Sequence, residues 1–197
     1  TGSLTGYLPL AGGTMTGDVT FNDNVDIKLG TSNDCTLMHD GTNTYIDNGT
    51  GDLIIRNQAD DARIRFQCDD GSGGTATYFD LQGSQAGARL YTNWYDNSVI
   101  ALGNGLDVQI YHDATDSHFY SQTGHLYFKQ AADDKDIYFQ TDDGAGSVRT
   151  YMYLDGSQAA SGDACWTIFP DNSRVGFGDS KDLQIHHESG NNYINNT

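Results

Sequence analysis

The chain has 197 residues, of which 27 are Asp or Glu and 10 are Lys or Arg, and its formal net charge is −17. This balance argues against nucleic acid as a partner, because affinity for a phosphate backbone comes largely from cationic side chains. It argues in the same way against an anionic membrane surface. No run of 18 apolar residues occurs, so insertion into a membrane is not expected either.

The supply of core-forming residues is small. Leu, Ile, Val and Phe together make up about 19% of the chain, a level at which composition alone favours disorder. Twelve Tyr and a series of short alternating runs favour order instead. We reconcile the two observations by expecting that one chain cannot bury a sufficient core and that several chains build the core together.

The chain opens with a segment that does not repeat. Residues 1–20 include the sequence LPLAGGTMTG at Leu8–Gly17, and we expect them to form a connector ahead of the first β-structure.

A long internal repeat fills the remainder of the chain. A shift of 73 residues places His39 on His112 and aligns many identical residues around them, and a second shift of 75 residues places His112 on His187. The chain therefore contains a first β repeat at 21–93, a second at 94–168 and the beginning of a third at 169–197.

Each repeat shows the pattern of short strands. Apolar and polar residues alternate in Asp52–Arg56, Ala62–Gln67 and Tyr78–Leu81, which predicts half-buried strands. The Asp-Gly, Asn-Gly and Gly-Gly pairs between such runs supply the positive φ that tight turns need. No window keeps helical spacing, so the chain is predicted to be all-β.

The two complete repeats also predict which face of a strand is buried. The residues that recur unchanged are Ile64, Phe66, Ile137 and Phe139. The intervening residues that differ between the copies are Arg63, Arg65, Asp136 and Tyr138. Because residues two apart lie on one face of a strand, we expect the unchanged residues to point inward and the changing ones to face solvent.

A repeat of this length narrows the architecture. It is longer than a propeller blade or a solenoid coil, and its aliphatic content is low for a sandwich. We expect an elongated repetitive β-structure in which three parallel chains intertwine into a homotrimeric fibre, in the manner of a β-prism or β-helix, so that strand edges are covered between chains. The alternative is an array of monomeric β domains.

Two features resemble bacteriophage tail fibre proteins. Leu8–Gly17 resembles the LPLxGGTMTG box of these proteins, and Leu106–Asp113 and Asp182–His187 are similar to DLQIYHD-type repeats in the fibres of marine and cyanobacterial phages. The resemblance implies a homotrimer in the virion, extracellular after release, that joins other tail proteins and supports host recognition and attachment, with a host surface glycan as a candidate receptor. No receptor-binding head or enzymatic module is recognisable, which favours a shaft segment over a tip.

Two other functions stay open, a monomeric cell-surface carbohydrate-binding β-repeat module and a fragment of a polysaccharide depolymerase. Paired acids of the kind that glycosidases use recur at matched positions in both repeats. An active site rarely occurs twice in one chain at matched positions of a repeat, so no enzyme activity, catalytic residue or cofactor is expected.

Two sets of residues could ligate a metal. His39, His112 and His187 hold equivalent positions, and three chains would bring the copies of each imidazole together. The carboxylates of Asp69, Asp70, Asp142 and Asp143 are of the type that calcium prefers. The favoured interpretation of both sets is structural, as hydrogen-bonded turn residues.

Aromatic residues are the remaining candidates. Aromatic side chains that could stack on sugar rings are Tyr91, Trp94, Tyr95, Tyr120, Tyr151, Tyr153 and Trp166. The glycan contacts selected from them are Tyr91, Tyr95, Tyr120 and Tyr153. The favoured alternative, for Trp94 and Trp166 especially, is that aromatic rings fill the core. Three cysteines, Cys35, Cys68 and Cys165, share no metal-ligand spacing and are expected to be small buried side chains.

Overall fold

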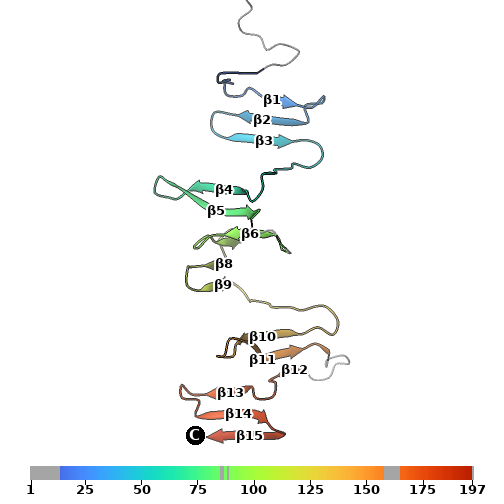
Figure 1. The fold of residues 1–197 in the computed structure, drawn as a ribbon, viewed down its shortest axis with the longest axis vertical. Helices are drawn as coiled ribbons and strands as arrows, with labels where there is room; N and C mark the ends of the chain where they lie inside the picture. Colours follow the sequence, from blue (N-terminus) through green and yellow to red (C-terminus); the bar gives the residue numbers. More distant parts are fainter. Residues whose placement is uncertain (1–13, 85–86, 88, 158–164, 197) are drawn as a thin grey trace, which may run out of the picture. The chain divides into compact units, whose positions relative to one another are not determined.

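The computed structural model describes residues 14–84, 87, 89–157 and 165–196. Within these residues the chain is all-β, as predicted, with fifteen strands and no α-helix (Figure 1). No helix in this part of the chain is long and apolar enough to cross a membrane. Residues 8–13 of the predicted connector box lie outside the described residues.

The described strands form five antiparallel sheets, each of three strands consecutive in sequence. Two kinds of sheet alternate along the chain. The three histidine sheets, named for a histidine near the end of the middle strand, comprise β1 (Ile27–Leu29), β2 (Cys35–His39) and β3 (Thr44–Asn48); β7 (Ile100–Leu102), β8 (Val108–His112) and β9 (Ser117–Ser121); and β13 (Arg174–Phe177), β14 (Leu183–Glu188) and β15 (Asn191–Asn196). The two long-strand sheets comprise β4 (Arg63–Asp69), β5 (Thr75–Gln82) and β6 (Tyr91–Trp94); and β10 (Ile137–Asp142), β11 (Val148–Asp155) and β12 (Trp166–Ile168).

The sheets recur in step with the sequence repeat, so that one repeat corresponds to one histidine sheet followed by one long-strand sheet. The correspondence extends to irregularities. The pairing of β4 with β5 shifts register between Phe66 and Gln67, and the pairing of β10 with β11 shifts between Phe139 and Gln140, at the equivalent place. The predicted limits of the repeats stay predictions, and β6 crosses the limit at 93/94 by one residue.

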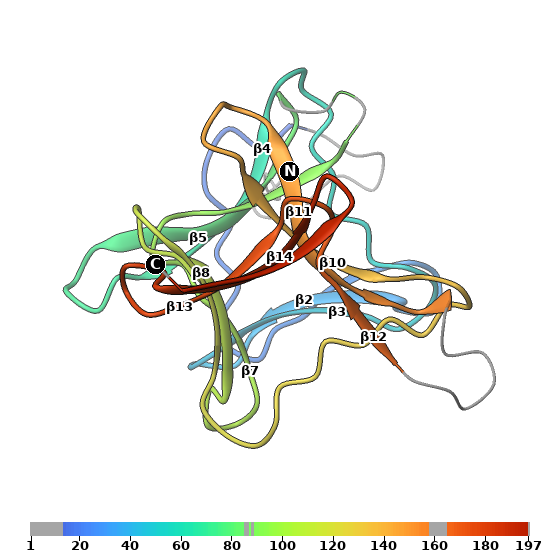
Figure 2. The same cartoon turned by 90° about the horizontal axis from the view of Figure 1, so that it is seen from below.

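The chain divides into two compact units. The first comprises Thr1–Val99 with Tyr111–Asp116, and contains the sheets β1–β3 and β4–β6. The second comprises Ile100–Ile110 with Ser117–Thr197, and contains β10–β12 and β13–β15. Within the second unit, β13 and β14 run side by side in both views (Figure 2), in keeping with their pairing from Arg174–His186 to Phe177–Leu183.

The single chain has no apolar core in its described part. No hydrophobic side chain there is buried, and the two buried residues are polar, Asp80 and His186. The expectation that one chain buries too little apolar surface on its own is met within these residues. Even on the strand face whose residues recur unchanged between the repeats, Phe66 is 41% exposed and Phe139 is 44% exposed.

On the opposite face, Arg63 and Arg65 are exposed, as predicted. Arg65 pairs across the strands with Asp80, and the Asp80 side chain has no exposed surface. This face nevertheless carries the most deeply buried side chain of the described structure, that of Asp80, for which the sequence analysis made no prediction. The physical reason is that Arg63 and Arg65 both reach the Asp80 carboxylate, at 3.5 Å and 3.8 Å, and cover it with their own side chains.

Two predictions are wrong for the single chain. The run Asp52–Arg56 was predicted to be a strand, but residues 52–58 form none. No neighbouring strand within the described residues offers them a hydrogen-bonded partner. The cysteines are free as expected, but only Cys35 is partly buried, while Cys68 and Cys165 are exposed because no core exists around them.

Candidate functional site

The three equivalent histidines share one backbone contact. The N–H of Asn24 donates to the carbonyl of His39 at 2.8 Å, and the same bond recurs from Asn97 to His112 at 2.8 Å and from Asn172 to His187 at 3.0 Å. Each asparagine has a positive φ, of 62°, 63° and 68° in turn. This bond joins the loop before each histidine sheet to the end of the middle strand of that sheet. Because it recurs in all three histidine sheets, the backbone of each histidine has a structural role.

The imidazole rings bond locally as well. Nδ1 of His39 lies 3.1 Å from Oγ1 of Thr44, and Nδ1 of His187 lies 2.9 Å from Oδ1 of Asn192, each across the hairpin to the next strand. Among the described residues, no group of three or more His, Cys, Asp or Glu side chains could hold a metal ion. Metal ligation by His39, His112 and His187 thus requires additional copies of the chain, as the sequence interpretation already supposed.

The paired aspartates lie in matching hairpin turns. Oδ2 of Asp69 accepts the N–H of Gly71 at 2.8 Å, and Oδ2 of Asp142 accepts the N–H of Gly144 at 2.8 Å. Oδ1 of Asp70 accepts the hydroxyl and the N–H of Ser72, both at 2.8 Å, and these bonds with a further one from Gly74 lower the pKa of Asp70.

The second turn repeats this arrangement with backbone donors. Oδ1 of Asp143 accepts the N–H groups of Ala145 and Ser147, at 2.8 Å and 3.2 Å, which lowers the pKa of Asp143. The oxygens of both acid pairs therefore fold the turns between β4 and β5 and between β10 and β11.

The four tyrosines suggested as glycan contacts belong to three different parts of the fold. Tyr91 lies in β6, Tyr95 just after it, Tyr120 in β9 and Tyr153 in β11. Tyr91 and Tyr120 are exposed, whereas the Tyr95 hydroxyl bonds Asp80 and the Tyr153 ring stacks on Tyr138 at 5.1 Å. Tyr95 and Tyr153 thus serve packing within the chain.

Trp94 and Trp166 differ in how their rings pack. Trp94 stacks on Phe79 at a centroid distance of 4.7 Å, and Phe79 stacks in turn on Phe66 at 4.4 Å. Trp166 in β12 is about half exposed, so the expectation that it fills a core is not met in the single chain. The aromatic stack remains open to solvent on one side, because Trp94 is itself 38% exposed.

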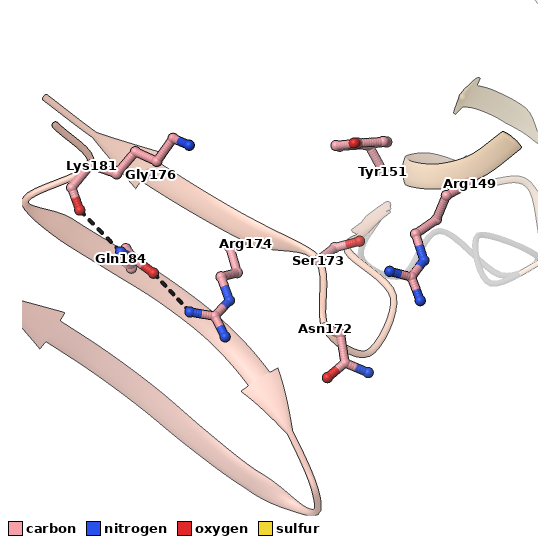
Figure 3. A pocket seen from close by; sticks show the side chains of 8 residues that line it. All are labelled: Arg149, Tyr151, Asn172, Ser173, Arg174, Gly176, Lys181 and Gln184. Carbon is pink, nitrogen blue, oxygen red and sulfur yellow. Dashed lines mark hydrogen bonds between the residues drawn. The ribbon is translucent and has the colours of Figure 1, made fainter. Parts of the chain in front are cut away.

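A cavity of about 420 Å³ in the second unit is the strongest candidate site (Figure 3). Arg149 and Tyr151 of β11 lie on one side of it, and Arg174, Lys181 and Gln184 of the β13–β14 hairpin lie on the other. The turn residues Asn172 and Ser173 lie between them, with the Ser173 hydroxyl donating to the carbonyl of Thr150 at 3.4 Å.

No family model matches the chain, and comparisons with curated proteins and with solved structures found no match either. The resemblance of Leu8–Gly17 and of the repeats to tail fibre sequences therefore stays a prediction from the sequence.

The sequence had indicated Tyr151 as an aromatic residue that could stack on a sugar, but the three cations of this cavity were missed, although a signal for them exists. The positions equivalent to Arg149, Arg174 and Lys181 in the preceding repeat are apolar, namely Ala76, Val99 and Leu106. The equivalents of the neutral polar lining are unchanged, namely Tyr78, Asn97, Ser98 and Gln109. A search for positions at which the repeats differ in charge would have found all three cations.

Proposed function

We propose that the chain is a structural and adhesive segment of a bacteriophage tail fibre, which supports attachment of the virion to its host and catalyses no reaction. Three parallel copies intertwine into an elongated homotrimer. The observation that carries this proposal is that no hydrophobic side chain is buried in the described part of the chain. A chain with ordered strands and no core of its own obtains that core from other chains.

The amount of exposed surface supports assembly. The chain exposes 16318 Å². Two separate compact units, each of half the 21.4 kDa chain mass, would together expose only about 11000 Å². The excess, about 5000 Å² per chain, is as large as the area that obligate protein interfaces bury.

Two apolar linkers, residues 52–58 and 125–131, support intertwining in particular. They hold equivalent positions after the first two histidine sheets, and neither forms a strand. In the first linker, Leu53, Ile54 and Ile55 are 53%, 73% and 61% exposed, and the backbone of residues 52–58 forms no backbone hydrogen bond to another described residue. An exposed apolar segment whose backbone groups have no backbone partner among the described residues is suited to pair with the sheet edge of another chain.

The assignment to a phage fibre rests on sequence. The LPLAGGTMTG segment at Leu8–Gly17 and the histidine repeats resemble tail fibre proteins. The fold is compatible with this assignment, because each repeat supplies the same pair of sheets and a longer chain could extend the array by adding repeats.

The experiment that tests the assembly is a measurement of native mass, by sedimentation equilibrium and native mass spectrometry at micromolar concentration. We expect a species of three times the 21.4 kDa chain mass, about 64 kDa. A compact, cooperatively unfolding monomer would contradict the proposal and favour the monomeric carbohydrate-binding module. Binding of the assembled protein to host cells, competed by the same protein, tests the adhesive part.

A further inference from the structure

We propose that the cavity between β11 and the β13–β14 hairpin binds an acidic saccharide. Arg149, Arg174 and Lys181 would take its negative group, and the ring of Tyr151 would lie against the sugar. This inference names the ligand class of the adhesive role proposed above and rests on that role for its biological meaning, although the cavity itself lies within one chain.

The charge distribution is the first support. The chain has only ten Lys and Arg residues and a net charge of −17, yet three of its cations line this one cavity. A strongly acidic chain repels anions at long range, so an anion binds only where cations are gathered locally. Two nearby acids reduce the local charge in part, because Glu188 pairs with Arg174 at 3.0 Å and Asp143 interacts electrostatically with Arg149.

The comparison between repeats is the second support. Arg149, Arg174 and Lys181 come from two different sheets, and each replaces an apolar residue of the preceding repeat. Independent drift would scatter such changes over the surface. Their convergence on one cavity, beside Tyr151 and other neutral polar residues that did not change, indicates a shared role.

The guanidinium of Arg174 is positioned in advance. Nη1 of Arg174 donates to Oε1 of Gln184 at 3.0 Å and Nη2 donates to Oε2 of Glu188 at 3.0 Å, which fixes the guanidinium while leaving other N–H donors for a ligand. Gln184 is held in turn by the carbonyl of Lys181, to which its Nε2 donates at 3.2 Å. Lys181 itself forms no ion pair in the part of the chain that the structure describes.

The neutral residues that line the cavity favour a saccharide over a bare anion as the ligand. The Tyr151 ring is about half exposed, and its hydroxyl is oriented by a 3.3 Å bond to the carbonyl of Asp142. An exposed, oriented aromatic ring offers an apolar face to a sugar, while Asn172 and Gln184 offer amides to its hydroxyls. The volume of about 420 Å³ is within the range of small-molecule sites, about 300–1000 Å³.

The test measures binding to the full chain in its native assembly, by calorimetry and by saturation-transfer NMR. The probes are 3′-sialyllactose and digalacturonate as acidic saccharides, lactose as the neutral saccharide and sodium sulfate as the bare anion. We expect at least one acidic saccharide to bind at least tenfold more tightly than lactose and than sulfate. Equal binding of lactose, or binding of sulfate as tight as that of the acidic saccharides, would overturn the proposal.

The matched variant restores the residues of the preceding repeat, Arg149→Ala, Arg174→Val and Lys181→Leu together. The positive φ at Lys181 is 60° and at Leu106 is 56°, so the backbone of position 181 has a shape that leucine already adopts in this chain. We expect the variant to lose at least tenfold in affinity while keeping its native mass. A control with the same change of charge elsewhere, Lys28→Leu, Arg89→Val and Lys135→Leu, should bind as the parent does.

The outcomes separate this inference from the proposed function. A trimer that binds no acidic saccharide, or whose restored variant binds as well as the parent, overturns the inference alone. A restored variant that falls apart into monomers overturns it in favour of an ion pair between copies of the chain. A monomer that binds acidic saccharide through these cations overturns the fibre assembly and leaves the inference standing.

Discussion

The Tyr95 hydroxyl donates a hydrogen bond of 2.8 Å to Oδ2 of Asp80, the one described side chain with no exposed surface. Arg63 and Arg65 approach the same oxygen at 3.5 Å and 3.8 Å, and Oδ1 has no hydrogen-bond partner within the described residues. The second repeat replaces this cluster completely. Tyr138 and Tyr153 stack there, and Asp136 accepts hydrogen bonds from the Tyr138 hydroxyl at 2.8 Å and from the Gly156 N–H at 2.9 Å.

Removal of the Asp80 carboxylate should therefore destabilise the first repeat. For Asp80→Ala we expect a loss of about 2 kcal/mol in the free energy of unfolding, because two arginines lose their partner but stay partly hydrated. Tyr95→Phe removes one bond to a carboxylate and should cost about 1.5 kcal/mol. Urea unfolding of the native assembly measures both.

The equivalence of the two clusters gives a sharper test. The triple change Arg63→Asp, Arg65→Tyr and Asp80→Tyr installs the residues of the second repeat and should recover most of the stability that Asp80→Ala loses. A triple variant less stable than Asp80→Ala would show that the two repeats are not interchangeable on this face.

Asn24, Asn97 and Asn172, which have a positive φ, should tolerate glycine better than alanine. Asn97 has φ 63° and donates its backbone N–H to His112. The hydrogen bond survives either substitution, but a β-carbon in the left-handed region costs about 1 kcal/mol or more, a cost that glycine does not have. We expect Asn97→Ala to lower the urea midpoint clearly and Asn97→Gly to change it little. Equal effects of the two substitutions would mean that the backbone conformation is not the important feature.

Acid should weaken the fold through the turn carboxylates. The pKa of Asp40 is lowered chiefly by the N–H groups of Asn43 and Thr42, and the pKa values of Asp70 and Asp143 are lowered by their turn donors. A folded-state pKa below the ordinary value of 3.8 stabilises the fold above that pH, and the contribution is lost as pH falls through the folded-state pKa. We expect the melting temperature to be flat from pH 7 to about pH 5 and to fall below about pH 4. The double variant Asp70→Asn, Asp143→Asn should show a shallower fall between pH 4 and pH 2.

Added salt should stabilise the assembly. Each chain carries a net charge of −17, and three copies in contact repel one another. Screening shortens the range of that repulsion to about 10 Å at 0.1 M salt. The melting temperature should therefore rise as sodium chloride is raised from 10 mM to 300 mM, and a flat or falling curve in differential scanning calorimetry would contradict the expectation.

The sequence predicted the local features of this fold and missed those that depend on distant residues. The runs at 62–67 and 78–81 form β4 and β5 because alternation reports directly on which residues share a strand face. The turn role of Asp70 was accessible for the same reason, since its partners lie within four residues. The burial of Asp80 was missed because its partners, Arg63 and Arg65, belong to another strand.

The candidate cavity shows the same limit. Arg149 lies in β11 and Lys181, 32 residues later, lies in the turn between β13 and β14, so no local pattern joins them. Only a comparison of equivalent positions in the repeats identifies these cations. The preceding repeat has the same fold without them, and so shows which residues the fold itself requires. Leu106 and Lys181 occupy equivalent turns with the same backbone conformation, so the fold accepts either side chain there. The positive charge of Lys181 is therefore not required by the turn and points to another role.

The apolar linkers provide the most direct test of intertwining. Ile54→Pro removes a backbone N–H that has no backbone partner within the described residues, so the substitution breaks no backbone hydrogen bond described within the single chain. Pairing of the linker with another chain would need that N–H, and proline in a paired strand is strongly disfavoured. We expect the variant to shift from about 64 kDa toward the chain mass of 21.4 kDa, and its far-ultraviolet circular dichroism to lose β character, because the released chains have no core of their own.

The matched control is Thr20→Pro, at an exposed position that also lies outside every strand. It should leave the native mass unchanged. Amide hydrogen exchange gives a second readout, because residues 52–58 should be protected in the parent assembly and exchange rapidly in Ile54→Pro. Rapid exchange of these amides in an intact parent trimer would place the contacts between chains elsewhere, on the open face of Phe66, Phe79 and Trp94.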